Sequence, residues 1–588
     1  MILYESEIEQ ISLELLRDEN GYAILYGPDL LECAAPERTF TDVVLKKRLR
    51  AAIERINPHI PPAALEQAAH ALQTVSEPQM VVRNRSVHRL LLGGLLVEFA
   101  VGDEKKTDLV HFIDFAQPSN NDFLVVNQFT ITGTKQPRRP DVIAFVNGLP
   151  LAVVELKNPA NEQTDVWDAF NQLQTYKSDI AAIFHTNELL IVSDGLNARI
   201  GSLTANKEWF LPWKTIEGQT GAPASVTQLE VLLKGVFDKR RFLDLIRYFI
   251  VFEQERGAPT LKKIAGYHQF HAVNYGLEET IRASRVHFAA LGELKGTYLA
   301  NPMRGGEIGD QRIGVIWHTQ GSGKSLTMAF YTGRLVAHRD MENPTIIVLT
   351  DRNDLDDQLF GTFSRCSEIL RQMPEQATSR EDLVEKLKGR KAGGVFFTTI
   401  QKFMPTAESG GSLSDRHNIV VIADEAHRTQ YGFEAKLKVR KTSTKAIATG
   451  DGQVTPHRAE FAPPEYTERY EVGYAQHLRD ALPNATFVAF TGTPVSSEDR
   501  DTRAVFGDYI HVYDMQQAKE DGATVAIYYE SRLDKLSLSA ADMAAIDVEV
   551  DELAEDEEES TQSQLKSRWA ALEKVVGAQP RVVSVAAD

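Results

Sequence analysis

Short apolar runs alternate with longer amphipathic segments through much of this 588-residue chain. Between residues 125 and 200 the runs are short and bounded by Gly, Pro and Asn, which predicts β-strands, one of them at 181–185. Beyond residue 260, buried runs are separated by segments long enough for helices. These runs occur at 314–318, 345–350, 394–399, 418–423 and 486–492. This alternation is typical of a parallel sheet wound with helices, so the predicted fold class is α/β.

The same pattern divides the chain into three predicted parts. We expect residues 1–250 to form one domain, with its core at about 85–200, and residues 251–500 to form the wound α/β domain. The segment ERGAP, at 255–259, contains helix breakers and indicates a linker. Residues 501–588 include strand-like segments but are too few for another complete α/β domain.

Composition excludes some classes of protein and leaves DNA binding open. Hydrophobic residues at 43% and charged residues at 25% are typical of a folded globular chain. No apolar run approaches 18 residues and the N-terminus is acidic, so we expect no membrane span, no secretory signal and a cytoplasmic location. The net charge is −18, but nine acids fall within 547–559, a run for which we have no functional account. DNA binding depends on local basic clusters rather than on net charge.

The segment WHTQGSGKSLTM, residues 317–328, predicts a phosphate-binding loop. It follows a predicted strand and opens a predicted helix, and its glycines let backbone N–H groups point at phosphate oxygens. Lys324 is expected to reach the β- and γ-phosphates and Ser325 to bind Mg²⁺. His318 replaces the usual first glycine of this pattern. The predicted nucleotide-binding residues here are Thr319, Gln320, Gly321, Ser322, Gly323, Lys324 and Ser325.

Two adjacent acids follow another buried run. Asp424 and Glu425 come directly after the apolar segment 420–423 and begin the sequence DEAH. A carboxylate at the end of a strand can hold Mg²⁺, and a second beside it can orient the attacking water. We therefore predict Asp424 as a metal and nucleotide ligand and Glu425 as the catalytic base.

The segment 138–159 predicts a β-hairpin that turns at Asn147-Gly148. Two carboxylates one strand apart can bind Mg²⁺, which activates water, and a neighbouring lysine can stabilise the charge on a phosphate. We predict Asp141 and Glu155 as catalytic metal ligands and Lys157 as a catalytic residue. A three-residue loop would place the two acids opposite each other, whereas a two- or four-residue loop would shift them by one. A cross-strand salt bridge is the alternative reading of these charges.

Residues 260–500 resemble the DEAH-box branch of superfamily 2 helicases and translocases. The resemblance rests on the phosphate loop, on DEAH and on the segments 344–358, 395–403 and AFTGTP at 489–494. It implies that Thr491 and Thr493 couple ATP hydrolysis to DNA. It also implies that Gln269, in GYHQFHAV, reads the adenine base.

The hairpin resembles the PD-(D/E)xK nuclease fold, in which Pro140-Asp141 and Glu155-Leu156-Lys157 match the signature. Gln172 and Tyr176 resemble the Q-x-x-x-Y element of the nucleases found in DNA-processing motors. Residues four apart share one face of a helix. The resemblance therefore implies that both side chains contact the DNA backbone.

A nuclease of this type placed before a superfamily 2 motor resembles the restriction (R) subunit of type I restriction–modification enzymes. The resemblance implies ATP-dependent translocation of double-stranded DNA, coupled to Mg²⁺-dependent cleavage of unmodified DNA away from the recognition site. It also implies ATP and Mg²⁺ as cofactors, and methyltransferase (M) and specificity (S) subunits as partners. After Pro494 no Q-x-x-G-R sequence occurs, so we expect an incomplete second motor lobe and weak ATP hydrolysis by this chain alone.

Two other functions stay open at this point. The chain could belong to another nuclease–helicase, either a type III restriction subunit or a repair motor. In type III subunits we expect the nuclease after the motor, and a repair motor would not bind M and S subunits. A shortened chain could also be a catalytically idle protein that only binds DNA or partner subunits.

Overall fold

The computed structural model describes most of the chain up to residue 524. The described residues are 4–32, 36–158, 165–218, 220–255, 257–284, 306–350, 353–403, 412–426, 436–441, 466–471, 474–492, 503 and 505–524. The chain divides into two compact units, 1–524 and 525–588, and the described residues all belong to the first. The acidic run 547–559 and Thr493 lie outside the described residues.

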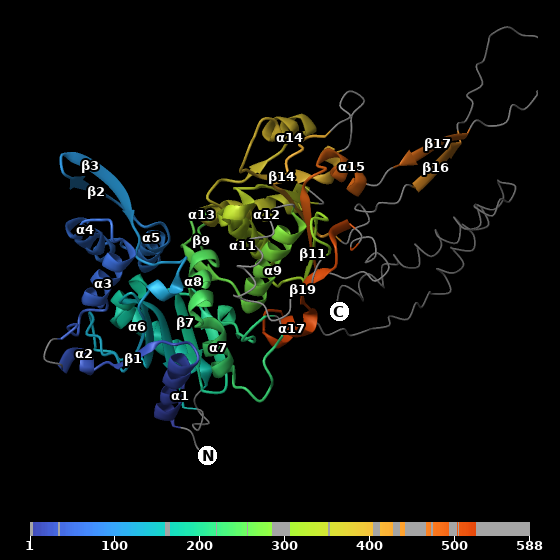
Figure 1. The fold of residues 1–588 in the computed structure, drawn as a ribbon. Helices are drawn as coiled ribbons and strands as arrows, with labels where there is room; N and C mark the ends of the chain where they lie inside the picture. Colours follow the sequence, from blue (N-terminus) through green and yellow to red (C-terminus); the bar gives the residue numbers. More distant parts are fainter. Residues whose placement is uncertain are drawn as a thin grey trace, which may run out of the picture. The chain divides into compact units, whose positions relative to one another are not determined.

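Residues up to 248 are built round a mixed six-stranded sheet (Figure 1). The strands lie in the order β1 (Ala23–Tyr26), β4 (Phe123–Asn127), β5 (Val142–Val146), β6 (Leu149–Leu156), β7 (Leu189–Ser193), β8 (Ala198–Gly201). The helices are α1 (Glu5–Asp18), α2 (Asp29–Glu32), α3 (Lys46–Ile56), α4 (Pro62–Gln73), α5 (Met80–Gly93), α6 (Val166–Asp179), α7 (Gln228–Val236) and α8 (Lys239–Tyr248). The central strands β5 and β6 are buried along their whole length. Helix α6 covers one face of the sheet, and α1, α3, α7 and α8 contribute to the core on the other.

The β5–β6 hairpin has the register that brings the two predicted acids together. Asn147 and Gly148 have φ values of 53° and 77°, and Val146 pairs with Leu149 across this two-residue turn. Such a turn alone would set Asp141 opposite Val154. A bulge after Ala144 shifts the register, so that Val142 pairs with Val154. Continued by one residue, this pairing places Asp141 opposite Glu155.

The expected linker at 255–259 lies instead in the turn of a second hairpin. Strands β9 (Ile250–Glu253) and β10 (Leu261–Ile264) pair antiparallel, and Glu253 lies opposite Leu261. Residues that break helices occur in hairpin turns as well as in linkers. Here the residues of β9 are buried, so the segment is the turn of a packed hairpin. Helix α9 (Tyr267–Ala283) follows directly, so a short ordered connection joins the two parts of the fold.

The second sheet has seven parallel strands. They lie in the order β13 (Glu375–Gln376), β14 (Val395–Thr399), β12 (Thr345–Thr350), β15 (Ile419–Asp424), β18 (Thr486–Thr491), β11 (Arg312–His318), β19 (Tyr509–Tyr513). The helices around it are α9, α11 (Lys324–Ala337), α12 (Asn353–Arg365), α13 (Ser367–Leu370), α14 (Arg380–Leu387), α15 (Tyr474–Ala481) and α17 (Met515–Glu520). All five apolar runs predicted as strands of this part are confirmed, and the α/β fold class is confirmed with them.

Two sequence-based expectations are corrected by this topology. We expected residues from 501 onward to start a second lobe, but β19 pairs in parallel with β11 and so belongs to the first lobe's sheet. Residues 525–588, the larger part of this expected lobe, lie outside the described residues. The predicted strand at 181–185 is a 3₁₀ helix, because α6 ends at Asp179 and the chain must turn before β7. Its apolar residues Ile183 and Phe184 are buried all the same.

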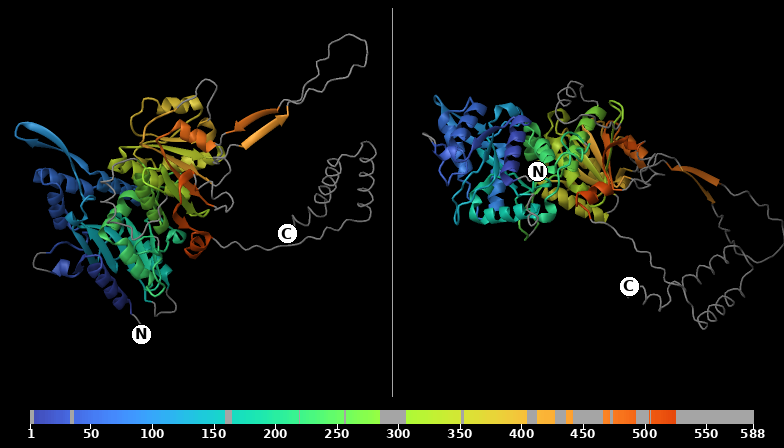
Figure 2. Two further views of the ribbon diagram at one scale, coloured as in Figure 1. Left: turned by 45° about the vertical axis from the view of Figure 1, so that its right-hand side comes forward. Right: turned by 90° about the horizontal axis from the view of Figure 1, so that it is seen from below.

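One continuous core of apolar side chains joins the two sheets. It includes Val154 of β6, Phe249 next to β9, Phe270 of α9 and Val348 of β12. Two further strand pairs form sheets of their own: β2 (Leu95–Val101) pairs with β3 (Glu104–Val110), and β16 (Lys436–Lys441) pairs with β17 (Tyr466–Glu471) (Figure 2). Val97 of β2 and Val110 of β3 belong to the same core. Among the helices of the described residues, none is both long and apolar enough to cross a membrane.

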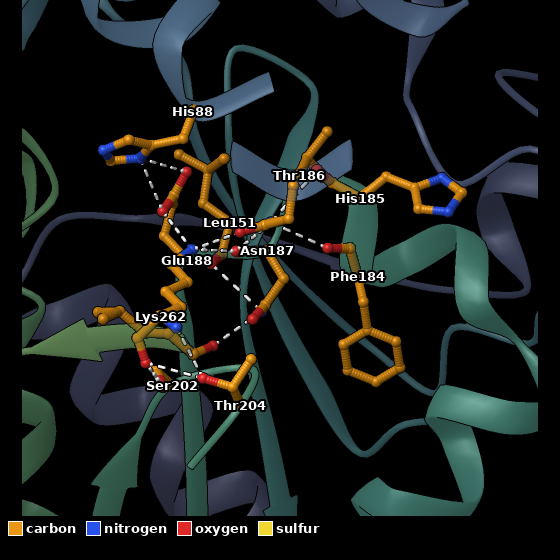
Figure 3. A network of polar contacts seen from close by, with 12 residues as sticks. His88, Leu151, Phe184, His185, Thr186, Asn187, Glu188, Ser202, Thr204 and Lys262 are labelled. Carbon is orange, nitrogen blue, oxygen red and sulfur yellow. Dashed lines mark hydrogen bonds and ion pairs between the residues drawn. The ribbon is translucent and has the colours of Figure 1, made fainter. Parts of the chain in front are cut away.

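A buried polar network ties α5 and β10 to the loop before β7 (Figure 3). The Lys262 ammonium lies 2.6 Å from Glu188 Oε2 and also donates to Asn84 Oδ1 and the Asn187 carbonyl. His88 Nδ1 lies 3.0 Å from Glu188 Oε1. Burial alone would raise the pKa of Glu188, but the nearby His88 and Lys262 hold this pKa below its usual value. The network therefore fixes the first part of the fold to the segment that leads into α9.

Candidate active sites

The acids Asp141 and Glu155 lie side by side at one edge of the first sheet. Asp141 immediately precedes β5 and Glu155 is near the end of β6, so both reach the same edge. Asp141 Oδ2 accepts a hydrogen bond of 2.7 Å from the Leu156 N–H. The Glu155 side chain is fully buried and Asp141 is 7% exposed. The hairpin register thus delivers two carboxylates to a site from which water is largely excluded.

The predicted partners of Glu155 surround one of its oxygens. Lys157 Nζ lies 3.2 Å from Glu155 Oε1, and the Tyr176 hydroxyl donates to the same oxygen at 3.3 Å. The Gln172 amide donates to the Tyr176 hydroxyl at 2.6 Å. Tyr176 is buried, so in this structure its hydroxyl contacts the carboxylate. Contact of Gln172 and Tyr176 with DNA stays a prediction.

The surroundings of both carboxyl groups raise their pKa values and so favour the protonated forms. Burial raises the pKa of Asp141 from its usual 3.8 to about 6, although the Leu156 N–H and the nearby Lys157 favour the ionised form. Burial and the neighbouring Asp141 raise the pKa of Glu155 well above its usual range. A cation bound between two buried acids of this kind would favour their ionised forms, because it offsets the repulsion between the two negative charges.

The chemistry of the site fits a magnesium ion. Glu155 Oε2 is buried and has no hydrogen-bond partner among the described residues. Across those residues no group of three or more His, Cys, Asp or Glu side chains is arranged to hold a metal. Mg²⁺, however, commonly takes one or two carboxylates together with water and substrate phosphate oxygens. Asp141 and Glu155 are the residues that would hold it.

A third acid near this site was missed by the sequence analysis. Glu9 of α1 is 8% exposed, and its oxygens accept hydrogen bonds from the Asn127 and Gln128 amides, each at 2.6 Å. Glu5 and Glu9 both contribute to raising the pKa of Asp141. Glu9 stands more than 130 residues before Asp141 in an acidic amphipathic helix, and no local pattern distinguishes it from its exposed neighbours.

The predicted phosphate loop lies at the carboxyl end of β11, as expected. Gly321 and Gly323 both have φ values of 83°, and Gly323 is the N-cap of the 14-residue helix α11. Backbone N–H groups at the start of a helix can bind an anion, and the helix dipole favours one there. The Thr319 N–H is bonded to the Tyr513 carbonyl of β19 at 2.9 Å. His318, in place of the usual glycine, is buried and lies 2.9 Å from His511 Nδ1.

Glu425 of the second motif reaches this loop. Asp424 ends β15, and Glu425 follows with a φ of 47°, a strained value for a residue other than glycine. Glu425 Oε1 lies 3.7 Å from Lys324 Nζ. A Cβ on Gly492, after β18, would come within 2.7 Å of the same ammonium. Three strands that are neighbours or near neighbours thus bring Lys324, Glu425 and Gly492 together at one edge of the sheet, where parallel sheets bind ligands.

Gln269 lies against the phosphate loop. Its amide donates to the Gly323 carbonyl at 3.1 Å and to Thr327 Oγ1 at 3.2 Å, and its Oε1 accepts from the Gly266 N–H. Reading of adenine by Gln269 stays a prediction. Thr491 is buried at the end of β18, and its proposed coupling role is likewise untested.

The fold and sites together define a P-loop ATPase lobe joined to a nuclease-like mixed sheet. The chain belongs to the SWI2/SNF2 ATPase family, whose sequence profile matches residues 268–563, just over half of the chain. Residues 2–209 match the profile of the N terminus of type I restriction enzyme R proteins. The resemblance to type I restriction enzyme R subunits is therefore confirmed.

Individual relatives agree with these profiles. The type I restriction enzyme HindI endonuclease subunit of Haemophilus influenzae is 42% identical over all of this chain and 51% of its own length. A Methanocaldococcus jannaschii protein, provisionally described as a type I restriction endonuclease subunit, is 33% identical over 99% of this chain and 51% of its own length. A Staphylococcus saprophyticus type I endonuclease subunit is 25% identical over 77% of this chain and 40% of its own length. The chain thus spans about half the length of the first two relatives.

Proposed function

We propose that this chain acts as the R subunit of a type I restriction–modification system. In this role it couples ATP-driven translocation of double-stranded DNA to Mg²⁺-dependent cleavage of unmodified foreign DNA, away from the recognition site. The observation that carries the proposal is the pairing of two sites in one chain. A buried carboxylate pair beside Lys157 lies in one sheet, and a phosphate loop in contact with Glu425, next to Asp424 at the end of β15, lies in the other.

In the nuclease site each side chain has a separate task. Bound Mg²⁺ would lower the pKa of a coordinated water and offset the charge of the scissile phosphate. Asp141 and Glu155 hold the metal, and the Leu156 N–H fixes the orientation of Asp141. Lys157, 3.2 Å from Glu155, is close enough to stabilise charge that develops on the phosphate. Tyr176 orients Glu155 through its hydroxyl, and Gln172 orients Tyr176.

In the nucleotide site the protein supplies charge and orientation. The N–H groups at the start of α11 bind phosphate oxygens, and Lys324 exchanges its contact with Glu425 for the β- and γ-phosphates. Glu425, once released, can orient the attacking water. Asp424 and Ser325 hold the Mg²⁺ that accompanies ATP. Thr491 and Thr493 couple this step to DNA.

The partners follow from the same assignment. M and S subunits supply methylation and sequence recognition, and double-stranded DNA in the cytoplasm is the substrate. The names of the relatives support this part of the proposal, since each is called an endonuclease subunit of a type I restriction enzyme.

The first test is ATP hydrolysis by the purified chain with and without duplex DNA. We expect Lys324→Ala to reduce DNA-stimulated turnover about 100-fold or more, because it removes the charge that meets the developing negative phosphates. Lys519→Ala, an exposed lysine of α17, is the matched control and keeps wild-type turnover. Wild-type turnover no higher than that of Lys324→Ala, with ATP still bound, would instead favour the idle DNA- or partner-binding protein.

The nuclease half is tested separately. With M and S subunits, ATP and Mg²⁺, we expect Asp141→Asn to abolish DNA cleavage and to leave ATP hydrolysis intact. Loss of both activities in this variant would contradict the assignment of Asp141 to a separate nuclease site. A pull-down of M and S subunits by the wild-type chain distinguishes the proposal from a repair motor.

A further inference from the structure

The connection between β4 and β5 crosses the edge of the sheet that carries the nuclease acids. Strand β4 ends at Asn127 and β5 begins at Val142, and these two residues pair with each other. Residues 128–141 therefore lie at the same edge as Asp141 and Glu155. This segment carries three basic residues and no acid before Asp141. We name residues 131–139 the β4–β5 loop.

The β4–β5 loop is held in place by backbone and side-chain contacts. Ile131 and Arg138 form an antiparallel bridge, with hydrogen bonds of 2.7 and 2.9 Å between their backbones. The Thr134 N–H donates to the Asp179 carbonyl at 3.1 Å, and a Cβ on Gly133 would come within 1.9 Å of that oxygen. Arg138 Nη2 lies 2.7 Å from Asp179 Oδ2. The loop is thus fixed to the end of α6, the helix that supplies Gln172 and Tyr176.

Two cations of this loop are exposed next to the site. The Lys135 side chain is 63% exposed, and its ammonium donates to Ser178 Oγ at 3.3 Å and lies 3.7 Å from Asp179 Oδ1. Arg139 is exposed, and its guanidinium has no hydrogen-bond or ion-pair partner within the part of the chain that the structure describes. The Arg139 carbonyl accepts from the Tyr176 hydroxyl at 3.5 Å, and that hydroxyl is 3.3 Å from Glu155 Oε1. A single side chain therefore separates the Arg139 backbone from the catalytic carboxylate.

Charge is distributed unevenly round this site. Helix α1 contributes Glu5 and Glu9, which act electrostatically on Asp141. The β4–β5 loop contributes only cations. A DNA backbone that reaches the metal would be repelled by the α1 side and attracted by the loop side. Because Arg138 is already paired with Asp179, Lys135 and Arg139 are the cations available to it.

We propose that Lys135 and Arg139 bind phosphates of the substrate DNA beside the scissile phosphate and so position the strand on Asp141 and Glu155. The proposal rests on the nuclease function proposed above. Arginine suits this task, because its planar guanidinium can bind two phosphate oxygens at once. The alternative is that Lys135 and Arg139 are solvated surface cations with no role in DNA binding.

Salt dependence of DNA binding tests the proposal without requiring cleavage. Binding of a labelled duplex by the full chain is measured at several salt concentrations, with Ca²⁺ in place of Mg²⁺. For Arg139→Ala and for Lys135→Ala, we expect the slope of log K against log salt to fall by about 1 each. The change in Kd between 50 and 200 mM salt should then be about fourfold smaller than for the wild type. Arg139→Lys keeps the charge and should keep the slope.

The control and the cleavage assay separate the possible outcomes. Lys105→Ala changes an exposed lysine of β3, in a different sheet, and should leave the slope unchanged. In cleavage with M and S subunits, Arg139→Ala should raise KM for DNA and leave kcat near the wild-type value, whereas Lys157→Ala should lower kcat. Unchanged slopes in an enzyme that cleaves would overturn the loop proposal alone. Equal losses of slope in Lys105→Ala would also overturn it. A wild type that fails to cleave refutes the nuclease function, and the slopes still decide whether the loop contacts DNA.

Discussion

Asp141 shows how a single residue, proposed here as catalytic, can work against the stability of the free protein. Its carboxyl group is buried and its pKa is raised from 3.8 to about 6. The folded protein therefore binds the proton of Asp141 more tightly than the unfolded chain does. The stabilising contribution of this group is complete below the unfolded pKa and is lost as the pH rises through about 6. At neutral pH, without metal, the folded chain therefore holds a charge it would be more stable without.

This predicts the behaviour of Asp141→Asn in denaturant unfolding. In EDTA at pH 8, we expect the variant to be more stable than the wild type by about 2–3 kcal/mol, from a difference of roughly two pKa units. At pH 4 the gain should disappear, and Mg²⁺ at pH 8 should reduce it, since the metal stabilises the wild-type carboxylate. A gain that is the same at both pH values would show that Asp141 is not held in the way described.

At the scale of elements, local patterns predicted the strands better than they predicted strand partners. The apolar runs of the second sheet and the Asn-Gly turn were found because their chemistry is local. The residues of β19 were recognised as strand-like, but their pairing with β11 depends on contacts nearly 200 residues apart in sequence. The pattern of apolar residues within 509–513 does not indicate that β11 is the neighbouring strand.

The nuclease hairpin shows the same division between local and non-local information. Asn147-Gly148 fixed the position of the turn, but the bulge after Ala144 decides that Asp141 faces Glu155. At this bulge Phe145 pairs with Pro150, which has no N–H to donate to the ladder, but a proline within a strand does not by itself say which pairing follows the bulge. Sequence reasoning could therefore name Asp141, Glu155 and Lys157 but could not settle their register. Glu9 was beyond reach, since only the packing of α1 brings it to the site.

The buried Lys262–Glu188 pair gives a test at this scale. We expect Lys262→Met to lower the free energy of unfolding by about 3 kcal/mol, because it removes the ammonium that pairs with the Glu188 carboxylate in a buried site. In a double-mutant cycle with Glu188→Gln, the two losses should couple by about 1–3 kcal/mol. Denaturant unfolding measures both quantities.

The adjacent lysine provides the control. Lys263 is 41% exposed and its ammonium lies 2.7 Å from Glu253, so Lys263→Met should cost less than about 1 kcal/mol. If the two lysine variants lose the same stability, or if the cycle is additive, the network in Figure 3 does not hold α5 and β10 together.

At the scale of the whole described unit, the two sites share one scaffold. The continuous apolar core runs from the first sheet through β9 and α9 into the second. Charged contacts add to it. Arg85 and Arg89 of α5 both bind Glu368 of α13, and Arg334 of α11 lies 3.3 Å from Asp244 of α8. The predicted boundary near residue 250 therefore lies between the two proposed sites, but the apolar core continues across it.

This architecture predicts cooperative unfolding of both parts. We expect one thermal transition for the two sheets together, and a shift of that whole transition to higher temperature when ATP and Mg²⁺ bind, since a ligand stabilises everything that unfolds with its site. Far-ultraviolet circular dichroism and the fluorescence of the five tryptophans, among them the buried Trp213, should report the same midpoint. In Lys324→Ala the shift should be lost. Two transitions, of which ATP moves only one, would contradict a shared core.

The bond between the phosphate loop and the edge strand has a mechanical consequence. Strand β19 is the outermost strand, it runs parallel to β11, and its Tyr513 carbonyl holds the Thr319 N–H at the start of the loop. Tension directed along β19 would load all of its hydrogen bonds to β11 at once, because the two strands run parallel to each other. Such a force would reach the phosphate loop through the hydrogen bond between Tyr513 and Thr319 while β19 was still paired. The nucleotide site would therefore respond to the mechanical load on this strand.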